Sequence, residues 1–214
     1  EQLFAALDPA SPQQVDEAFA AAFRELAGNE NSNAAIDGYL QILQQAAAGI
    51  DDEDFTLRFQ TYVSRNSPPA KVFSSLYTSF AAAQRSRLIV GVNILGPENR
   101  HVAMRDYTLH MQMFAFFKKL YPGVKLSLHA GELVLGMVEP EGLRSHIREA
   151  ILVAGADRIG HGIDIVHESN APQLLTIMKQ RPIAVEINLT SNEFILGVKN
   201  EAHPVRLYAR YGVP

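Results

Sequence analysis

Residues 126–132 read Leu126-Ser-Leu-His-Ala-Gly-Glu132, a short apolar run that ends in an imidazole and a carboxylate. A Pro122-Gly123 turn precedes the run, and its apolar first half predicts a buried strand over 125–128 that stops at His129. Parallel α/β folds carry their chemistry at strand ends. The motif is therefore expected at a functional edge of a sheet.

The same motif combines a metal ligand with a proton carrier. His129 can offer a neutral ring nitrogen to a metal ion, and Glu132 is close enough in sequence to exchange a proton with whatever that metal binds. A loop histidine that is hydrogen-bonded to a neighbouring carboxylate is the structural alternative. Short motifs also match by chance, so this one alone does not decide between the two interpretations.

Two later segments repeat the pattern of an apolar strand that ends in polar residues. Arg158-Ile-Gly-His-Gly162 ends in His161, and its flanking glycines let a ligand approach the backbone closely. Ala184-Val-Glu-Ile-Asn-Leu-Thr-Ser-Asn192 is the third such strand. Three successive strand ends with polar groups are how a barrel assembles one site.

Strands and helices alternate from Thr56 onward. Strands are predicted over 56–63 and 88–94 besides the three above, with helices between them, including long ones over 102–120 and 142–154. This alternation predicts parallel strands with right-handed crossovers. No glycine-rich dinucleotide or P-loop fingerprint follows a strand, which weakens a Rossmann interpretation. Residues 1–50 are predicted to be helical, beginning at the Ser11-Pro-Gln-Gln14 capping signal.

Other polar features are interpreted as structural. The acidic run Asp51-Asp-Glu-Asp54 lacks the spaced ligands and central glycine of a calcium loop, so a solvated loop is expected. His101 and His110 are expected to be surface or helix histidines, and His146 is expected to point outward. His167 is a weaker site candidate than His161.

Composition narrows the class of protein. The 214 residues are 47% hydrophobic and 20% charged, which suits one globular domain with a substantial core. A net charge of -4 provides no basic field for a phosphate backbone, so nucleic acid is not an expected partner. The sequence has no cysteine, so any zinc must be bound by histidine and carboxylate.

The sequence also predicts no membrane anchor. No apolar run approaches the ~20 residues of a membrane span, and the first residues lack the regions of a signal peptide. A cytoplasmic location is the default expectation. The chain begins at Glu1 without a methionine, which leaves room for a removed leader and makes a periplasmic or secreted location the alternative.

The strand-end motifs resemble those of the adenosine deaminase family in the metal-dependent amidohydrolase superfamily, a family that includes the adenosine-deaminase-related growth factors and the AMP deaminases. The matching segments, in family order and spacing, are Ser127-Leu-His-Ala-Gly-Glu132, Arg158-Ile-Gly-His-Gly162, Glu186-Ile-Asn-Leu-Thr-Ser-Asn192 and His203-Pro204. The resemblance covers 88–214 well and the earlier residues poorly. It implies a TIM-like (β/α)8 barrel, with 1–214 as a single domain that forms part of it.

The resemblance also implies a function and residue roles. The complete protein would deaminate adenosine, a purine nucleoside, to inosine and ammonia with the help of Zn²⁺, which lowers the pKa of bound water toward ~7. His129 would bind the metal, Glu132 would donate a proton to the purine, and His161 would orient the attacking hydroxide. Gly96 would hold the purine through its backbone, although a turn glycine before a proline is an equally good interpretation.

Two family signatures are missing from this sequence. It has no His-x-His pair, which ends the first strand in the family, and it stops at Gly212-Val-Pro214, where the strand with the family's Asp-Asp pair should begin. We therefore expect an incomplete barrel, an excerpt without its first and last strands, that alone is inactive and does not bind zinc tightly. A deaminase of AMP, adenine or an N6-substituted purine, and a noncatalytic signalling or binding protein, are the alternative functions.

Overall fold

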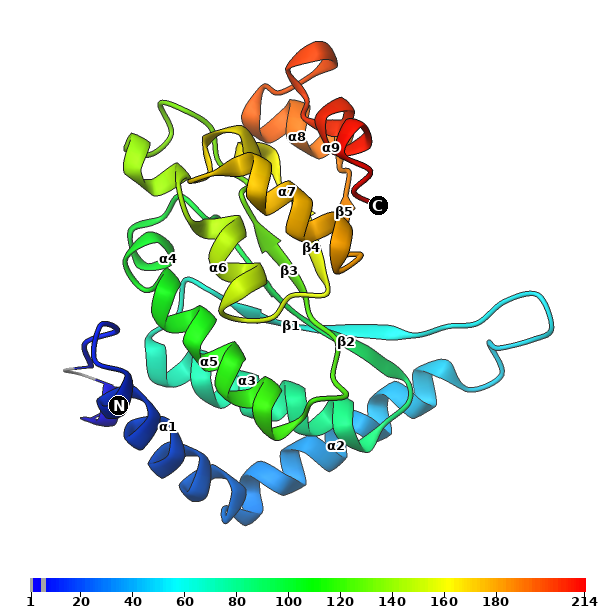
Figure 1. Cartoon of the computed structure of the whole chain (residues 1–214). Coiled ribbons are helices and arrows are strands. Elements are labelled where there is room, and N and C mark those ends of the chain that lie inside the picture. The colour runs from blue at the N-terminus through cyan, green and yellow to red at the C-terminus, as the bar shows by residue number, and fades with distance from the viewer. Residues whose placement is uncertain (1, 5–6) are drawn as a thin grey trace.

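The computed structural model describes residues 2–4 and 7–214, and in this part of the chain five parallel strands follow one another around an arc (Figure 1). The strands are β1 Phe59–Ser64, β2 Ile89–Leu95, β3 Ser127–Ala130, β4 Arg158–His161 and β5 Ala184–Glu186. β1 pairs with β2, and β3 pairs with β4, which pairs with β5. A single parallel bridge between Val92 and Leu126 joins the two groups, so the spatial order of the strands is their order in the chain.

Helices connect the strands and cover one side of the arc (Figure 1). The α-helices are α1 Pro12–Ala27, α2 Glu30–Ala47, α3 Pro69–Arg85, α4 His101–Arg105, α5 Tyr107–Leu120, α6 His146–Leu152, α7 Ala171–Gln180, α8 Leu189–Leu196 and α9 Val205–Tyr211. Short 3-10 helices lie at Gln2–Phe4, Pro140–Leu143, Ile163–His167 and Asn200–Ala202. No described helix has both the length and the apolar character needed to cross a membrane.

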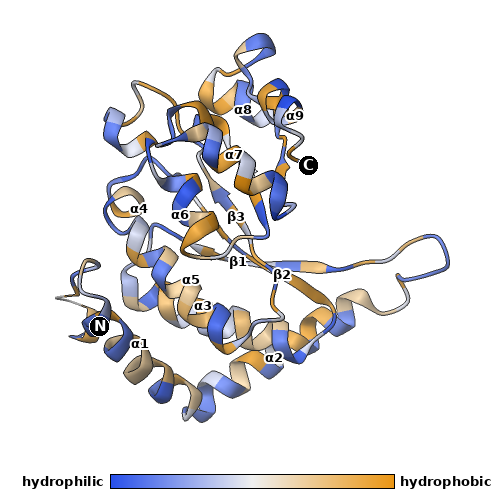
Figure 2. Ribbon diagram, in the orientation of Figure 1, coloured by the Kyte–Doolittle hydropathy of each residue, from blue (hydrophilic) through white to orange (hydrophobic). Residues whose placement is uncertain are grey.

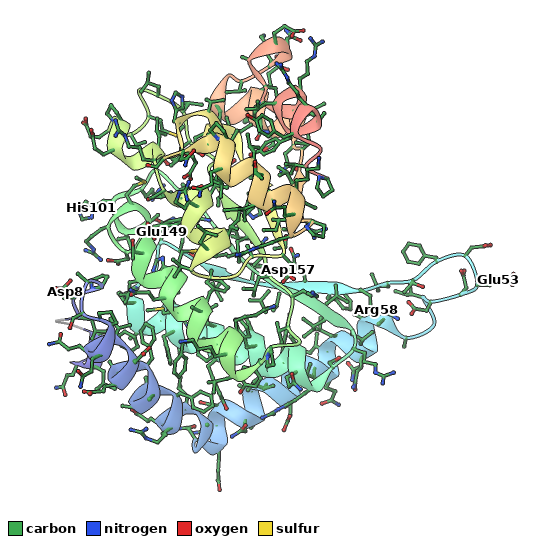
Figure 3. All side chains as sticks on the ribbon, viewed as in Figure 1. Asp8, Glu53, Arg58, His101, Glu149 and Asp157 are labelled. Carbon is green, nitrogen blue, oxygen red and sulfur yellow. The ribbon has the colours of Figure 1, made fainter. Side chains whose placement is uncertain are left out.

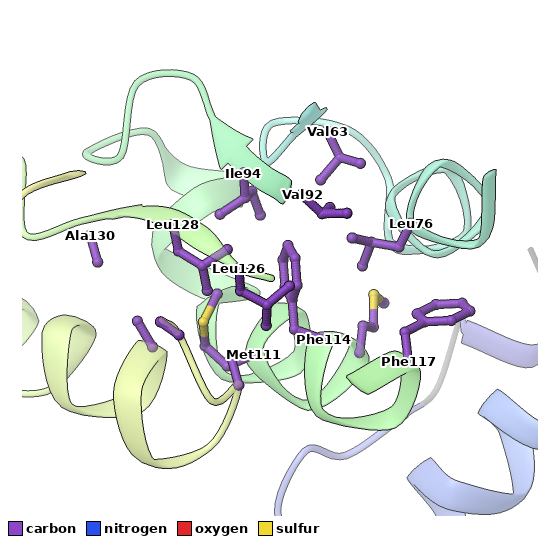
Figure 4. Packing of buried hydrophobic residues seen from close by; sticks show 14 of the residues in the cluster. Val63, Leu76, Val92, Ile94, Met111, Phe114, Phe117, Leu126, Leu128 and Ala130 are labelled. Atoms are coloured by element: carbon purple, nitrogen blue, oxygen red, sulfur yellow. The ribbon is translucent and has the colours of Figure 1, made fainter. Parts of the chain in front are cut away.

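The core lies between the strands and the helices (Figures 2 and 4). Leu126, just before β3, and Leu128, within it, point into this layer, where they face Met111 and Phe114 of α5 (Figure 4). All four side chains are fully buried, and burial of each such side chain contributes about 1.5–3 kcal/mol. The apolar alternation of the strands therefore decides which face of the sheet the helices cover.

The N-terminal helices form a second layer outside α3 and α5 (Figure 1). Phe19 of α1 is completely buried, and its ring lies 5.1 Å from that of Phe73 on α3 and 5.7 Å from that of Phe116 on α5. Helices occupy most of the described part of the 1–50 range, and residues 1, 5 and 6 of that range lie outside the described residues.

The opposite face of the sheet is polar. Asn93 on β2 donates from its amide to Gln60 on β1, and Ser127 on β3 donates to Glu186 on β5. Arg158 on β4 forms an ion pair with Glu186 at 2.6 Å. Because these side chains contact one another across the strands, they share one face, which is the concave side of the arc. Bulky aliphatic residues usually fill the inside of a closed barrel, so this face is unusually polar.

A loop after α2 extends away from the rest of the molecule (Figures 1 and 3). Asp51 forms an ion pair with Arg58 at 2.7 Å, and Asp52 accepts the backbone N–H groups of Asp54 and Phe55. The acidic run is exposed, as expected for a solvated loop. Its carboxylates stabilise the turn of the loop itself.

Several sequence expectations need correction. The predicted strand at 125–128 lies at Ser127–Ala130, so His129 is inside the strand, and the helix predicted over 102–120 is two helices that meet at Asp106. His146 points inward and is 4% exposed, because it hydrogen-bonds to a buried carboxylate. His110 is a helix histidine but not a surface one, since burial in the α5 interface leaves it 0% exposed.

Three further boundaries differ from the predictions. The third predicted strand end is a helix, because residues 189–196 form α8 and only Ala184–Glu186 is extended. The helix predicted over 142–154 is α6 at His146–Leu152, preceded by a 3-10 turn. β1 begins at Phe59 rather than at Thr56.

A tight turn follows β3. Gly131 adopts a φ of +74°, in the left-handed region that glycine enters at least cost, and its N–H donates to Glu98. Its carbonyl accepts the N–H groups of Ile163 and Asp164, which follow β4. A Cβ on Gly131 would lie 2.4 Å from Oδ1 of Asp164 and 2.8 Å from the side chain of Ile147. The turn therefore depends on glycine for both its φ and its space.

We expect Gly131→Ala to lower the free energy of unfolding by about 2–5 kcal/mol, because a left-handed φ costs an alanine about 1–2 kcal/mol and overpacking adds about 1–3 kcal/mol. Gly136→Ala is the matched control, since Gly136 has a φ of +89° and no atom within 4 Å of the added carbon. Urea unfolding of both variants tests this. Equal losses would show that the packing around Gly131 tolerates a side chain.

Candidate active site

His129 lies one residue before the end of β3, and its ring is oriented by an amide. Oδ1 of Asn93 accepts the backbone N–H of His129 at 3.2 Å and lies 3.1 Å from its Nδ1. Because this oxygen can only accept, Nδ1 carries the ring proton and Nε2 keeps a free lone pair. The amide group of Asn93 donates in turn to Gln60 at 3.3 Å, which fixes its orientation.

The surroundings of His129 favour its neutral form. Burial, together with the charges of His161 and Arg65, lowers the pKa of His129 to about 4. At neutral pH the ring is therefore uncharged. A neutral imidazole with a free Nε2 is the form that binds a metal ion.

His161 ends β4, and its backbone has a φ of 70°, which is unusual for a residue with a side chain. This conformation brings Nε2 within 3.6 Å of Oε1 of Glu132 and places the ring centroid 4.9 Å from that of His129. Burial and the negative charge of Glu98 raise the pKa of Glu132, while His161 and Arg65 oppose the shift. The partly buried carboxyl group can therefore hold a proton at a higher pH than usual.

A relay of polar side chains fixes the other side of His161. Oδ1 of the buried amide of Asn192 on α8 lies 2.7 Å from Nδ1 of His161, and Nδ2 of the same amide lies 2.9 Å from Nε2 of His203. Val205 donates its N–H to Nδ1 of His203, so Nε2 of His203 is the protonated nitrogen and requires the amide oxygen as its acceptor. Exchanging the positions of the amide oxygen and nitrogen meets this requirement, and the amide then donates to Nδ1 of His161. The proton of His161 then resides on Nε2, toward Glu132.

The structure thus brings together three of the four residues selected from the sequence, His129, Glu132 and His161. Their roles stay predictions. Gly96 lies at the end of β2 with a φ of +105°, and a Cβ there would lie 3.2 Å from the side chain of Asn66. Backbone geometry alone accounts for this glycine, so its contact with a purine also stays a prediction.

Sequence reasoning missed three residues that support this site. Glu98 is buried and accepts the N–H groups of the turn after β3, Arg65 lies beside it, and Asn93 orients His129. Asn93 carried a signal, because it is a polar residue inside an otherwise apolar strand. Glu98 and Arg65 each follow a strand end, so the argument that selected His129 could also have selected them.

The described residues do not form a metal centre by themselves. Among residues 2–4 and 7–214, no group of three or more histidine, cysteine, aspartate or glutamate side chains is arranged to hold a metal ion. A catalytic zinc ion needs three protein ligands. His129 is the candidate ligand that this part of the protein offers.

Among solved structures, an adenine deaminase has a similar fold. The adenine deaminase from Arthrobacter aurescens superposes with a TM-score of 0.53 at 17% sequence identity, over 95% of this chain and 61% of that one. This likeness concerns the fold alone. It confirms the predicted (β/α)8 barrel fold, of which the five described strands form a part.

Curated relatives extend the likeness to sequence. The adenosine deaminase of Mycobacterium tuberculosis (strain ATCC 25618 / H37Rv) is 29% identical over 175 residues, covering 78% of this chain and 43% of the relative. That of Pectobacterium atrosepticum is 30% identical over 174 residues, covering 81% of this chain and 46% of the relative. The chain thus spans less than half the length of these relatives.

The family model described as adenosine deaminase matches residues 22–214. The match includes all the strands and the three side chains that meet at the ends of β3 and β4. The chain therefore belongs to the adenosine deaminase family.

Proposed function

We propose that the protein containing this chain is an aminohydrolase that converts adenosine and water to inosine and ammonia. One observation carries the proposal: Glu132, a carboxyl group with a raised pKa, lies 3.6 Å from Nε2 of His161, whose ring lies 4.9 Å from that of His129. Membership of the adenosine deaminase family supports it. Because the chain spans less than half of its relatives, the activity belongs to the whole protein.

The proposed chemistry assigns one proton transfer to Glu132. Its carboxyl group donates a proton to the purine ring nitrogen beside the attacked carbon as water oxygen bonds to that carbon. One proton of the water restores the carboxyl group, and the other reaches the amino nitrogen, which leaves as ammonia. Nε2–H of His161 donates to the attacking oxygen and orients it.

A zinc ion is part of the proposal for the whole protein. His129 would supply one ligand through Nε2, whose lone pair is left free by the contact with Asn93. The other ligands would come from parts of the protein outside the described residues. The proton transfer assigned to Glu132 is independent of their identity.

The charges after α8 do not favour a nucleotide over a nucleoside. Among the described residues, the cations that follow α8 most closely in the chain, Lys199 and Arg206, form ion pairs with Glu193 at 3.1 Å and with Glu201 at 2.5 Å. A phosphate would have to compete with these carboxylates. A panel of adenosine, AMP, adenine and N6-methyladenosine distinguishes the alternatives, and no turnover of any member would favour a noncatalytic binding protein.

Glu132→Gln in the full-length protein should lower adenosine turnover by ~100 to 10,000-fold, the usual contribution of general acid–base catalysis. The amide keeps the shape of the side chain but has no proton to donate. Glu139→Gln is the matched control, because Glu139 is exposed in the same loop. Steady-state ammonia release measures both variants. Near-normal turnover in Glu132→Gln would assign the proton to another group.

His129→Ala should remove bound zinc from the full-length protein, because a catalytic site seldom keeps its ion with one of three ligands missing. His101→Ala serves as the control, since His101 is exposed at the start of α4, outside the site (Figure 3). Metal content per chain after dialysis is the measurement. Zinc retained at full occupancy in His129→Ala would exclude His129 as a ligand.

A further inference from the structure

A buried carboxylate lies directly behind the turn that carries Glu132. Glu98 follows β2, and its side chain is 1% exposed. Oε1 accepts the N–H of Gly131 and Oε2 accepts the N–H of Glu132, both at 3.0 Å. Neither N–H group donates to a backbone carbonyl, because the turn lies beyond the residues of β3 that pair with β4. Glu98 is thus the side chain that holds both N–H groups of this turn, while the carbonyl of Gly131 accepts the N–H groups of Ile163 and Asp164.

Arg65 and His146 hold Glu98 itself in place. Nη1 of Arg65 lies 3.5 Å from Oε2, and Nδ1 of His146 donates to Oε1 at 2.6 Å. Burial alone would raise the pKa of Glu98, but the charge of Arg65 and the hydrogen bond from His146 lower it to about 2. The carboxylate is therefore ionised at neutral pH and accepts all of these bonds.

The two partners of Glu98 are also fixed. Arg65 donates to the carbonyl groups of Ile94 at the end of β2 and of His129 in β3. The ring of His146 stacks on that of Tyr107 with a centroid distance of 3.6 Å and an interplanar angle of 3°. The hydroxyl group of Tyr107 donates to the carbonyl of His146 at 2.8 Å. The two groups that hold Glu98 are therefore themselves anchored to two strands and to two helices.

We propose that Glu98 is a positioning residue for the deamination, one that sets the backbone of Gly131 and Glu132 so that the Glu132 carboxyl group faces His161. This inference rests on the proposed function. A displacement of about 1 Å at a reacting group costs on the order of 100-fold in rate. The position of Glu132 should therefore affect turnover more than substrate binding.

The chain contains a matched control for this inference. Glu168 is also buried, at 4% exposed, and it also accepts two successive backbone N–H groups, those of Ile147 at 2.6 Å and Arg148 at 3.1 Å. Its hydrogen bonds hold the start of α6 rather than the turn at Glu132. Glu98→Gln and Glu168→Gln thus both replace a buried carboxylate with an amide. Each substitution affects two hydrogen bonds from backbone N–H groups.

The test uses the full-length protein with adenosine as substrate. Glu98→Gln should lower kcat by about 10 to 100-fold with KM little changed, while Glu168→Gln keeps the wild-type kcat. Amide hydrogen exchange should speed up at 131–132 in the first variant and at 147–148 in the second. Equal effects of the two variants on kcat, or unchanged exchange at 131–132 in Glu98→Gln, would overturn the proposal.

A second variant covers the case in which Glu98→Gln does not fold. Glu98→Asp keeps the negative charge for Arg65 but withdraws the oxygens from the turn by one methylene group, so it should show the same selective loss of kcat. A wild-type kcat in Glu98→Asp would overturn the inference. If the wild-type protein deaminates none of the purines, the proposed function fails, and hydrogen exchange still decides whether Glu98 holds the turn.

Discussion

The buried ion pair between Arg65 and Glu98 organises the end of the sheet where the candidate site lies. Each side chain is 1% exposed, and burial of two charges costs more than their mutual attraction returns unless further polar groups compensate. Here the compensation comes from the backbone. The guanidinium group binds carbonyl oxygens of Ile94 and His129, and the carboxylate binds the N–H groups of the next turn. The pair therefore joins backbone groups at the ends of β2 and β3 into one network.

Burial shifts the pKa values of the imidazole and the carboxyl group in the site in opposite directions. It lowers the pKa of His129 to about 4, which leaves the ring neutral, and it raises the pKa of Glu132, which favours the protonated carboxyl group. A metal ligand must be neutral imidazole, and a proton donor must be protonated. These are the forms that the proposed roles of His129 and Glu132 require, and the ionised Glu98 behind the turn strengthens the shift of Glu132.

The strands and helices could be predicted from the sequence more fully than the buried hydrogen bonds and ion pairs that connect them. Apolar alternation and strand-end polar residues predicted five parallel strands and the meeting of His129, Glu132 and His161, because both follow from local periodicity and from the geometry of parallel strands. The burial of His146 could not be predicted. It depends on a carboxylate 48 positions away in the chain, and nothing in the sequence around His146 marks that contact. Asn93 is the exception, because a polar residue in an otherwise apolar strand can be recognised from the sequence.

The short helix α6 shows why this end of the molecule behaves as one unit. It has seven residues, too few for a stable isolated helix, yet carboxylates from two different loops hold its first turn. Glu98, after β2, accepts from the ring of His146, and Glu168, after β4, accepts the N–H groups of Ile147 and Arg148. Negative groups at a helix start also complement its dipole. Apolar packing thus determines which face of the sheet is covered, whereas the buried charge of Glu98 connects the loop after β2 to the turn after β3, and that turn carries Glu132.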